Sequence, residues 1–206
     1  MGTCSSLRRR MMMSGGEQES ILPAGYTRLK YIYNTSNAYI DTGVALSSTD
    51  EVSFNYINVS STSGDKALWG ARDSSSLFCW TDRYGDATQT YFRWGGKSSR
   101  NYGIHNGSFV IRNNVIYWTN SAGGTGSWTS GAGTFQMSTS VWLFAYHGGS
   151  NTYPCKGVAM SYFIVKDKWH GIPCKDPNNV VGMYDIVNNV FHGSENSTAF
   201  IAGPNY

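Results

Sequence analysis

The sequence predicts an all-β protein built as a sandwich of two antiparallel sheets. Charged residues make up 14% of the 206 residues, well below the value of about 25% in typical globular chains. Aromatic residues reach 15%, and the chain holds 24 glycines. Short apolar runs with period-two alternation, separated by clusters of Gly, Ser, Asn and Asp, are typical of strands joined by turns. About a dozen such runs at this spacing predict a sandwich.

The first part of the body predicts a series of short strands. The clearest pattern lies at 50–59, where Val52, Phe54 and Tyr56 alternate with polar residues. This alternation indicates a strand with one face in the core and the other in water. The expected strands cover residues 29–33, 39–44, 50–59, 66–71, 77–80 and 90–94.

The second part of the body continues this pattern and ends in a hairpin. Asn113 and Asn114 predict a tight hairpin turn, because asparagine tolerates the positive φ that such turns require. Residues 121–133 are expected to form a loop of Gly, Ser and Thr, and the closing hairpin is expected to run from 180 to 191 with its turn at 185–189. The other expected strands cover residues 102–104, 108–112, 115–118, 141–146 and 157–165.

Three stretches of this sequence resemble one family. They are LPAGYTRLKYI at 22–32, YIDTG at 39–43, and the closing segment IPCK…VVGMYDIVNNVF…AGP that ends at Pro204. They are similar to the concanavalin A-like, laminin-G-like jelly-roll modules of gut Bacteroidales bacteria and their phages. The resemblance implies a two-sheet jelly-roll sandwich over residues 21–206, preceded by an extended N-terminal arm at 1–20. It supports the fold more than the function, because one fold hosts many functions.

The charge distribution argues against a nucleic-acid partner. The net charge is +3, and part of it comes from the run Arg8–Arg10, so the body is near neutral and lacks the basic surface that binds polyanions. No apolar run approaches the roughly 20 residues of a membrane span. The first 20 residues also lack the apolar core of a secretory leader. We therefore expect neither nucleic acid nor a membrane as a partner.

Few residues are arranged for catalysis or metal binding. Glycosidases need two carboxylates across a cleft, and no expected strand carries a paired arrangement of acidic residues. The four histidines, at 105, 147, 170 and 192, are expected in loops without metal spacing or a nucleophile turn. We expect no catalytic residue, metal ligand or cofactor. Asp41 is a candidate for Ca²⁺, but capping of a turn is the favoured use of a single aspartate.

The four cysteines are Cys4, Cys79, Cys155 and Cys174, and they lack CxxC spacing. We expect buried free thiols that act as small apolar residues. The alternative is a disulfide between Cys155 and Cys174.

A glycan-binding surface is the remaining candidate site. Sugars bind to aromatic rings flanked by polar side chains. The candidates are Trp80, Asp82, Arg83, Tyr84, Trp94, Trp128 and Tyr153. Trp128 is favoured, because its expected loop offers few apolar neighbours for packing. For each tryptophan the alternative is a place in the core.

The arm at 1–20 is expected to dock on a partner protein. Its basic triplet and its three flexible methionines suit an acidic-rimmed apolar groove. The docking residues are Arg8, Arg9, Arg10, Met11, Met12 and Met13. Residues 1–6 also match the N-myristoylation pattern, which we set aside because the resemblance points to bacteria and phages.

The leading hypothesis is a non-enzymatic surface protein of a bacteriophage virion, such as a head fibre, decoration or tail-associated protein. The arm would anchor it to other virion proteins, and the sandwich would bind a host-surface glycan. A homo-oligomer is expected, with a trimer as the guess. One alternative is an assembly protein that cements neighbouring virion subunits without binding sugar. A third hypothesis is a bacterial surface adhesin.

Overall fold

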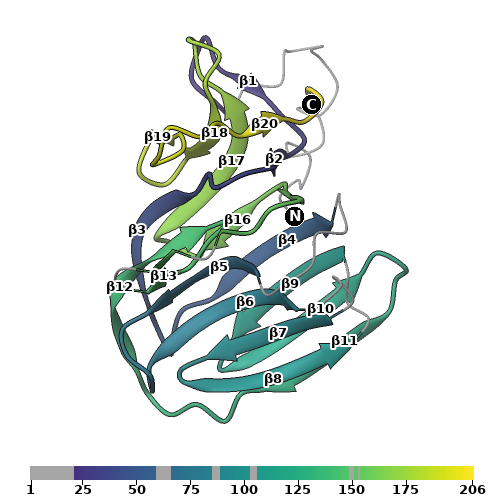
Figure 1. Ribbon diagram of the computed structural model, residues 1–206, viewed down its shortest axis with the longest axis vertical. Helices are drawn as coiled ribbons and strands as arrows, with labels where there is room; N and C mark the ends of the chain where they lie inside the picture. The colour runs from purple at the N-terminus through teal and green to yellow at the C-terminus, as the bar shows by residue number, and fades with distance from the viewer. Residues whose placement is uncertain (1–20, 59–65, 85–88, 103–105, 149–150, 153) are drawn as a thin grey trace, which may run out of the picture.

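The computed structural model describes residues 21–58, 66–84, 89–102, 106–148, 151–152 and 154–206. Within these residues all regular structure is β, and two sheets pack face to face (Figure 1). Among the described pairings, every one is antiparallel except a single parallel bridge between His147 and Ala71. The all-β jelly-roll sandwich predicted from the sequence is confirmed. The arm at 1–20, with its six predicted docking residues, lies outside the described residues.

The larger sheet has 12 strands among the described residues. They are β1 (Thr27–Arg28), β2 (Ile32–Asn34), β4 (Val52–Asn58), β9 (Asn106–Arg112), β10 (Val115–Asn120), β11 (Thr125–Thr129), β15 (Val158–Met160), β16 (Phe163–Val165), β17 (Trp169–Lys175), β18 (Val181–Asp185), β19 (Val190–His192) and β20 (Ile201–Ala202). The main path runs β11-β10-β9-β4-β16-β17-β18-β19. Strands far apart in sequence therefore become neighbours, as in the pairing of β4 with both β9 and β16.

The smaller sheet has eight strands among the described residues. They are β3 (Ile40–Ser47), β5 (Lys66–Arg72), β6 (Phe78–Tyr84), β7 (Gln89–Trp94), β8 (Lys97–Tyr102), β12 (Gln136–Leu143), β13 (His147–Gly148) and β14 (Asn151–Thr152). The order is β14-β13-β5-β6-β7-β8, and β12 joins β3 to β5.

Aromatic side chains from both sheets form the core between them. Phe54 of the larger sheet contacts Trp69 of the smaller sheet edge-on, with ring centroids 5.5 Å apart. Phe92 meets Phe109 across the layers in a tilted arrangement, also at 5.5 Å. All four are fully buried, and burial of each such side chain contributes about 1.5–3 kcal/mol. The alternation predicted at 50–59 is confirmed, because Val52, Phe54 and Tyr56 all lie in this core.

Both predicted hairpins are present. Asn113 and Asn114 have φ of 51° and 60° between β9 and β10, as a tight hairpin turn of this type requires. Asn189 has φ of 57° in the turn between β18 and β19.

Other expectations about individual elements are wrong. Residues 121–133 are not one loop, because Thr125–Thr129 form β11 and pair with β10. The strand β17, which pairs with β1, β16 and β18, has no counterpart in the predictions. His147, His170 and His192 lie in strands rather than in loops. Strand pairing, which the composition of a single segment does not reveal, decides each of these places.

Candidate functional site

The outward face of the smaller sheet is unusually aromatic. In β6, Cys79 and Thr81 are buried in the sandwich, whereas Phe78 and Trp80 lie on the opposite face and are half-buried. In β7, the same alternation turns Tyr91 outward. The solvent face of an antiparallel sheet normally carries polar residues. A surface rich in aromatic rings at this place is therefore a candidate binding surface.

Trp80 is held on both sides by neighbouring strands. It lies opposite Gly70 of β5 and opposite Arg93 of β7. Tyr146 stacks with Trp80 at a centroid distance of 5.0 Å and an interplanar angle of 11°. The Arg93 guanidinium carbon lies 4.8 Å from the centroid of Trp80 and 5.3 Å from that of Tyr91. The ring of Trp80 is thus fixed between a second aromatic ring and a cation.

Asp82 connects the members of this arrangement. Its carboxylate accepts a hydrogen bond from Trp80 Nε1 at 3.2 Å and forms an ion pair with Arg93 Nη2 at 3.3 Å. Asp82 is only 4% exposed, so water screens this charge pair less than it screens a surface pair. The network fixes the orientation of both Trp80 and Arg93.

A second stack lies on the other side of Gly70. Trp142 of β12 faces Gly70 in the strand register. The Trp142 ring stacks on Tyr39 at 4.3 Å and on His147 at 4.1 Å between centroids. A Cβ added at Gly70 would lie 2.1 Å from Trp80 Cβ. Glycine at this position therefore leaves the space that the aromatic groups need.

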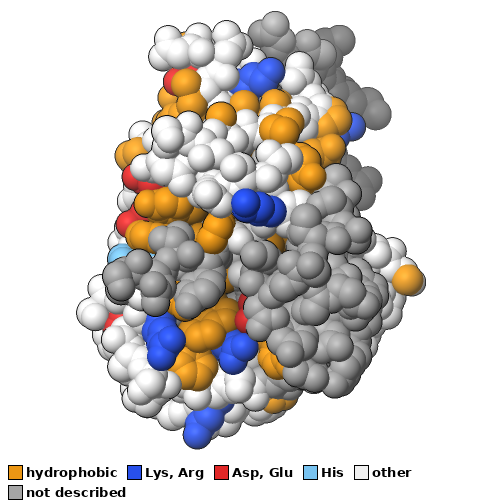
Figure 2. Space-filling view, viewed as in Figure 1, with side chains coloured by type: hydrophobic (Ala, Val, Ile, Leu, Met, Phe, Trp, Pro, Cys, Tyr) orange, Lys and Arg blue, Asp and Glu red, His pale blue; other side chains and the backbone are white. Residues whose placement is uncertain are grey.

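We call this surface the aromatic face. It consists of Tyr39, Gly70, Phe78, Trp80, Asp82, Tyr91, Arg93, Trp142, Tyr146 and His147. Figure 2 views the molecule from the side of the smaller sheet, and in its lower half apolar side chains gather between Lys or Arg side chains. The surface thus combines aromatic rings with charged groups, as sugar-binding and other ligand-binding surfaces do.

The structure brings two of the predicted site residues together, because Trp80 and Asp82 are hydrogen-bonded neighbours on the aromatic face. The backbone of Arg83 and Tyr84 belongs to β6, but their side chains are not among the described ones. Tyr153 also lies outside the described residues.

The other two predicted tryptophans lie elsewhere. Trp94 is fully buried, and its Nε1 donates to Asn114 Oδ1 at 2.8 Å, so it has no exposed ring face for a ligand. Trp128 lies in β11 opposite Ile116 and packs against the core. The expectation that Trp128 has few apolar neighbours is wrong, because the strand places it over the sandwich rather than in a loop.

Eight members of the aromatic face were missed from the sequence: Tyr39, Gly70, Phe78, Tyr91, Arg93, Trp142, Tyr146 and His147. Tyr91 and Arg93 do show period-two alternation with the buried Phe92, which is the signal that could have placed them outward. Trp142 and Tyr146 lie in a run that is apolar throughout, where no alternation distinguishes the two faces.

Neither metal binding nor disulfide formation is seen in the described part of the chain. No group of three or more His, Cys, Asp or Glu residues there is placed to hold a metal ion. Asp41 Oδ1 accepts a hydrogen bond from the Gly43 backbone N–H at 2.8 Å. Both residues lie within β3, so this aspartate bonds its own backbone locally as expected, but in a strand rather than in a turn. The described cysteines, Cys79, Cys155 and Cys174, are buried free thiols, so the disulfide alternative is wrong and the free-thiol prediction is confirmed.

Burial raises the pKa of Cys79 and of Cys174 to about 12. Both thiols therefore stay protonated and unreactive at neutral pH. The described residues also include no helix with the length and hydropathy to cross a membrane.

No family model and no curated protein matches this sequence. Among solved structures, domains LG4-5 of the mouse laminin alpha1 chain are similar at a TM-score of 0.48 and 9% identity, over 88% of this chain. The chain spans about half of that laminin chain, 47% of its length. A Scytalido-glutamic peptidase bound to a peptide-based transition-state analogue is similar at a TM-score of 0.35 and 14% identity, over 87% of this chain and 95% of the peptidase. Likenesses this low carry no information on function.

Proposed function

We propose that the aromatic face binds carbohydrate and that the protein is a non-enzymatic glycan-binding module. The observation that carries this proposal is the fixed network of Trp80, Asp82, Arg93 and Tyr146 on the solvent side of the smaller sheet. Half-buried rings offer the apolar surface that packs against sugar C–H groups, while Arg93 and His147 offer polar groups for hydroxyls. Because the network already fixes these groups, a ligand would order few side chains on binding.

Two buried donors of the aromatic face support this proposal. Arg93 Nε and Trp142 Nε1 have no hydrogen-bond partner among the described residues. Buried donors without a partner are rare and need an explanation. A ligand or bound water that reaches these atoms after a small adjustment of the stacks would supply the missing acceptors.

The placement of the carboxylates favours binding without hydrolysis. Asp41 and Asp82 are the acidic residues of β3 and β6 that point outward in the described part of this sheet. Two strands, β12 and β5, separate β3 from β6, so three strand spacings of about 4.8 Å put the carboxylates about 14 Å apart. Glycoside hydrolysis uses carboxylates about 5–10 Å apart. In addition, Asp82 forms an ion pair with Arg93, and Asp41 accepts the backbone N–H of Gly43.

A glycan-array screen of the 206-residue chain tests the proposal, with Trp80→Ala and Trp142→Ala as site variants. Tyr117→Ala is the matched control, because Tyr117 is a 39% exposed ring on β10 with the Arg112 guanidinium 5.1 Å from its centroid. Wild type and Tyr117→Ala should bind the same glycans, and each site variant should weaken binding about 10-fold. A folded wild type that binds no glycan, or site variants that bind like wild type, would refute the proposal.

The setting in which the module acts stays a prediction. We propose, from the family resemblance and the composition of the arm, that residues 1–20 anchor the protein to a phage particle. Incorporation into particles tests this. Replacement of Arg8, Arg9 and Arg10 by Gln should abolish incorporation and leave glycan binding unchanged, whereas normal incorporation of this variant would contradict it.

A second candidate function is contact with neighbouring subunits, and one apolar edge favours it. The hairpin of β18 and β19 exposes Val180, Val187 and Val190 at 47%, 42% and 46%. A group of exposed valines at a sheet edge is typical of a protein contact. Sedimentation of the chain with Val187→Ser and Val190→Ser tests this, because loss of an oligomer would support a subunit contact and an unchanged mass would oppose it.

A further inference from the structure

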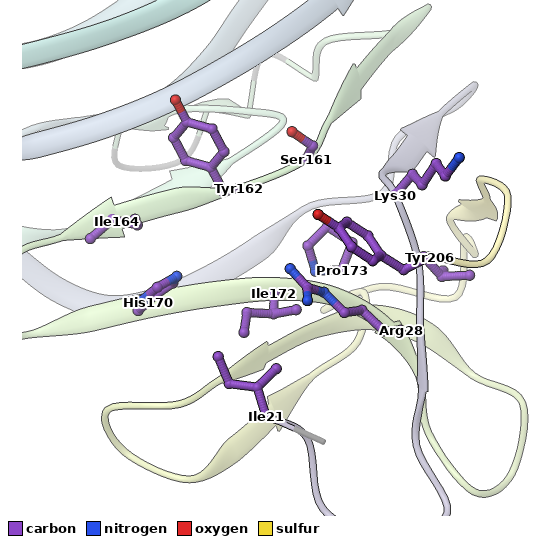
Figure 3. A pocket seen from close by; sticks show the side chains of 11 residues that line it. Ile21, Arg28, Lys30, Ser161, Tyr162, Ile164, His170, Ile172, Pro173 and Tyr206 are labelled. Carbon is purple, nitrogen blue, oxygen red and sulfur yellow. The ribbon is translucent and has the colours of Figure 1, made fainter. Parts of the chain in front are cut away.

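A cavity of about 360 Å³ lies on the outward face of the larger sheet, away from the aromatic face. Its floor is apolar and is formed by the buried residues Leu29, Ile172 and Pro173. In Figure 3, His170 and Ile172 lie along β17, and Tyr162 lies above His170 in this view. The cavity therefore joins an apolar floor to walls with hydrogen-bonding groups.

The rim of this cavity carries two cationic side chains. Arg28 and Lys30 line it, while its lining includes no Asp or Glu. Neither cation forms an ion pair with any described residue, since the described pairs are Arg93–Asp82 and Lys168–Asp50. Lys30 lies at the edge with its amino group directed away from the cavity, whereas the Arg28 guanidinium lies beside Tyr206 and Pro173 (Figure 3).

Arg28 is held in position by the C-terminal residue. Its guanidinium carbon lies 3.8 Å from the Tyr206 ring centroid, and its backbone oxygen accepts the Tyr206 N–H at 3.1 Å. A stacked guanidinium keeps its N–H groups in the ring plane available for an acceptor. On the opposite wall, burial and the nearby Arg28 lower the pKa of His170, although Asp185 opposes this shift. Arg28 and His170 thus line the same cavity.

We propose that this cavity binds a carboxylate group attached to a small apolar body. Arg28 would hold the carboxylate, because its planar guanidinium matches two carboxylate oxygens. His170 and Tyr162 would face the ligand from the other wall, and the apolar body would rest on Ile172 and Pro173. This site is independent of the proposed glycan function, which uses the opposite sheet.

The carboxylate can come from two sources, which an experiment can separate. One is a small molecule from solution. The other is the chain itself, since Glu17 and Glu19 precede the lining residue Ile21 in the sequence. Two residues span at most about 7 Å, so Glu19 is within reach of the cavity.

The test is a titration of the 206-residue chain with benzoate, followed through the imidazole NMR signals of His170. Benzamide is the matched neutral probe, and His192 of β19 is the internal reference because it does not line the cavity. The titration is repeated with Arg28→Gln and with a Glu17→Gln/Glu19→Gln double variant, at constant ionic strength.

Three outcomes are distinguishable. With an external ligand, benzoate should saturably raise the pKa of His170 in wild type, and Arg28→Gln should weaken this binding about 10-fold. With an internal ligand, the double variant alone should lower the pKa of His170 and should bind benzoate more tightly than wild type. Two results together would overturn the proposal. Benzoate would shift the pKa of His170 no more than benzamide does, in wild type and in the double variant. The double variant would also leave the pKa of His170 in the absence of added ligand unchanged.

Discussion

The outward faces of the two sheets carry the same kind of contact in different surroundings. On the larger sheet, Arg112 lies over the ring of Tyr117 at 5.1 Å as a surface pair. On the smaller sheet, Arg93 lies over Trp80 at 4.8 Å, but here the pair is also fixed by the Asp82 carboxylate and by stacking on Tyr146. The candidate site therefore differs from the outward face of the larger sheet by its network of contacts, not by its aromatic residues alone.

The largest expected effect comes from Gly70→Ala. An added Cβ would lie 2.1 Å from Trp80 Cβ and 2.8 Å from both the Trp80 Cα and the Cys79 carbonyl oxygen. Because backbone atoms cannot give way cheaply, we expect the free energy of unfolding to fall by about 3 kcal/mol or more. Gly133→Ala is the control, since its added Cβ meets nothing within 4 Å. Equal stability of the two variants in urea unfolding would show that the sheet relaxes around residue 70.

Asp82→Ala should separate a networked charge from a surface pair. It leaves Arg93 without its carboxylate and Trp80 Nε1 without its acceptor, so the free energy of unfolding should fall by about 2 kcal/mol. Arg112→Ala removes only the exposed contact with Tyr117, which is worth about 0.5–1 kcal/mol. Chemical denaturation of both variants measures the difference. If Arg112→Ala lowers the free energy of unfolding as much as Asp82→Ala does, the network around Arg93 adds no stability beyond that of a surface pair.

Thiol labelling compares one buried cysteine from each sheet. Cys79 lies under the aromatic face and Cys174 belongs to a small cluster on the larger sheet with Leu22 and Ile172. Since burial raises the pKa of both thiols to about 12, neither should react with Ellman's reagent in the native protein at pH 8. With Cys4 replaced by Ser, three thiols should appear only on unfolding. Rapid native labelling would show that one of these sites opens.

The smallest expected effect is a pH dependence from His170. Burial and Arg28 lower the pKa of this histidine in the folded protein, so the unfolded chain binds more protons near pH 6. The free energy of unfolding should therefore fall as the pH drops through about 6.5, the ordinary histidine value. His170→Gln should reduce this fall, and His192→Gln serves as the reference. A fall of the same size in His170→Gln would assign the pH dependence to other groups.

The fold could be predicted because its signals are local. The alternation of Val52, Phe54 and Tyr56 gives the buried face of one strand, and Asn113–Asn114 gives a turn. Each follows from properties of neighbouring residues, namely the two-residue period of a strand and the tolerance of asparagine for positive φ.

The candidate site could be predicted only in part, because its members meet through strand pairing. Trp80 and Asp82 are two residues apart on one strand, so their proximity follows from the sequence. Tyr146 and Arg93 reach Trp80 only because β5, β6, β7 and β12 lie side by side. Tertiary packing also buries Trp94, whose indole bonds to Asn114, and packs the half-buried Trp128 against the core.

Binding of glycan to the aromatic face can be tested by NMR through the indole N–H signals of the tryptophans. The chain should be titrated with a glycan that the array identifies while the signals are followed by NMR. The indole signals of Trp80 and Trp142 should move saturably, while those of the core residues Trp69, Trp94 and Trp169 should stay in place. Saturable shifts at Trp118 and Trp128 of the larger sheet, with Trp80 and Trp142 unchanged, would contradict it.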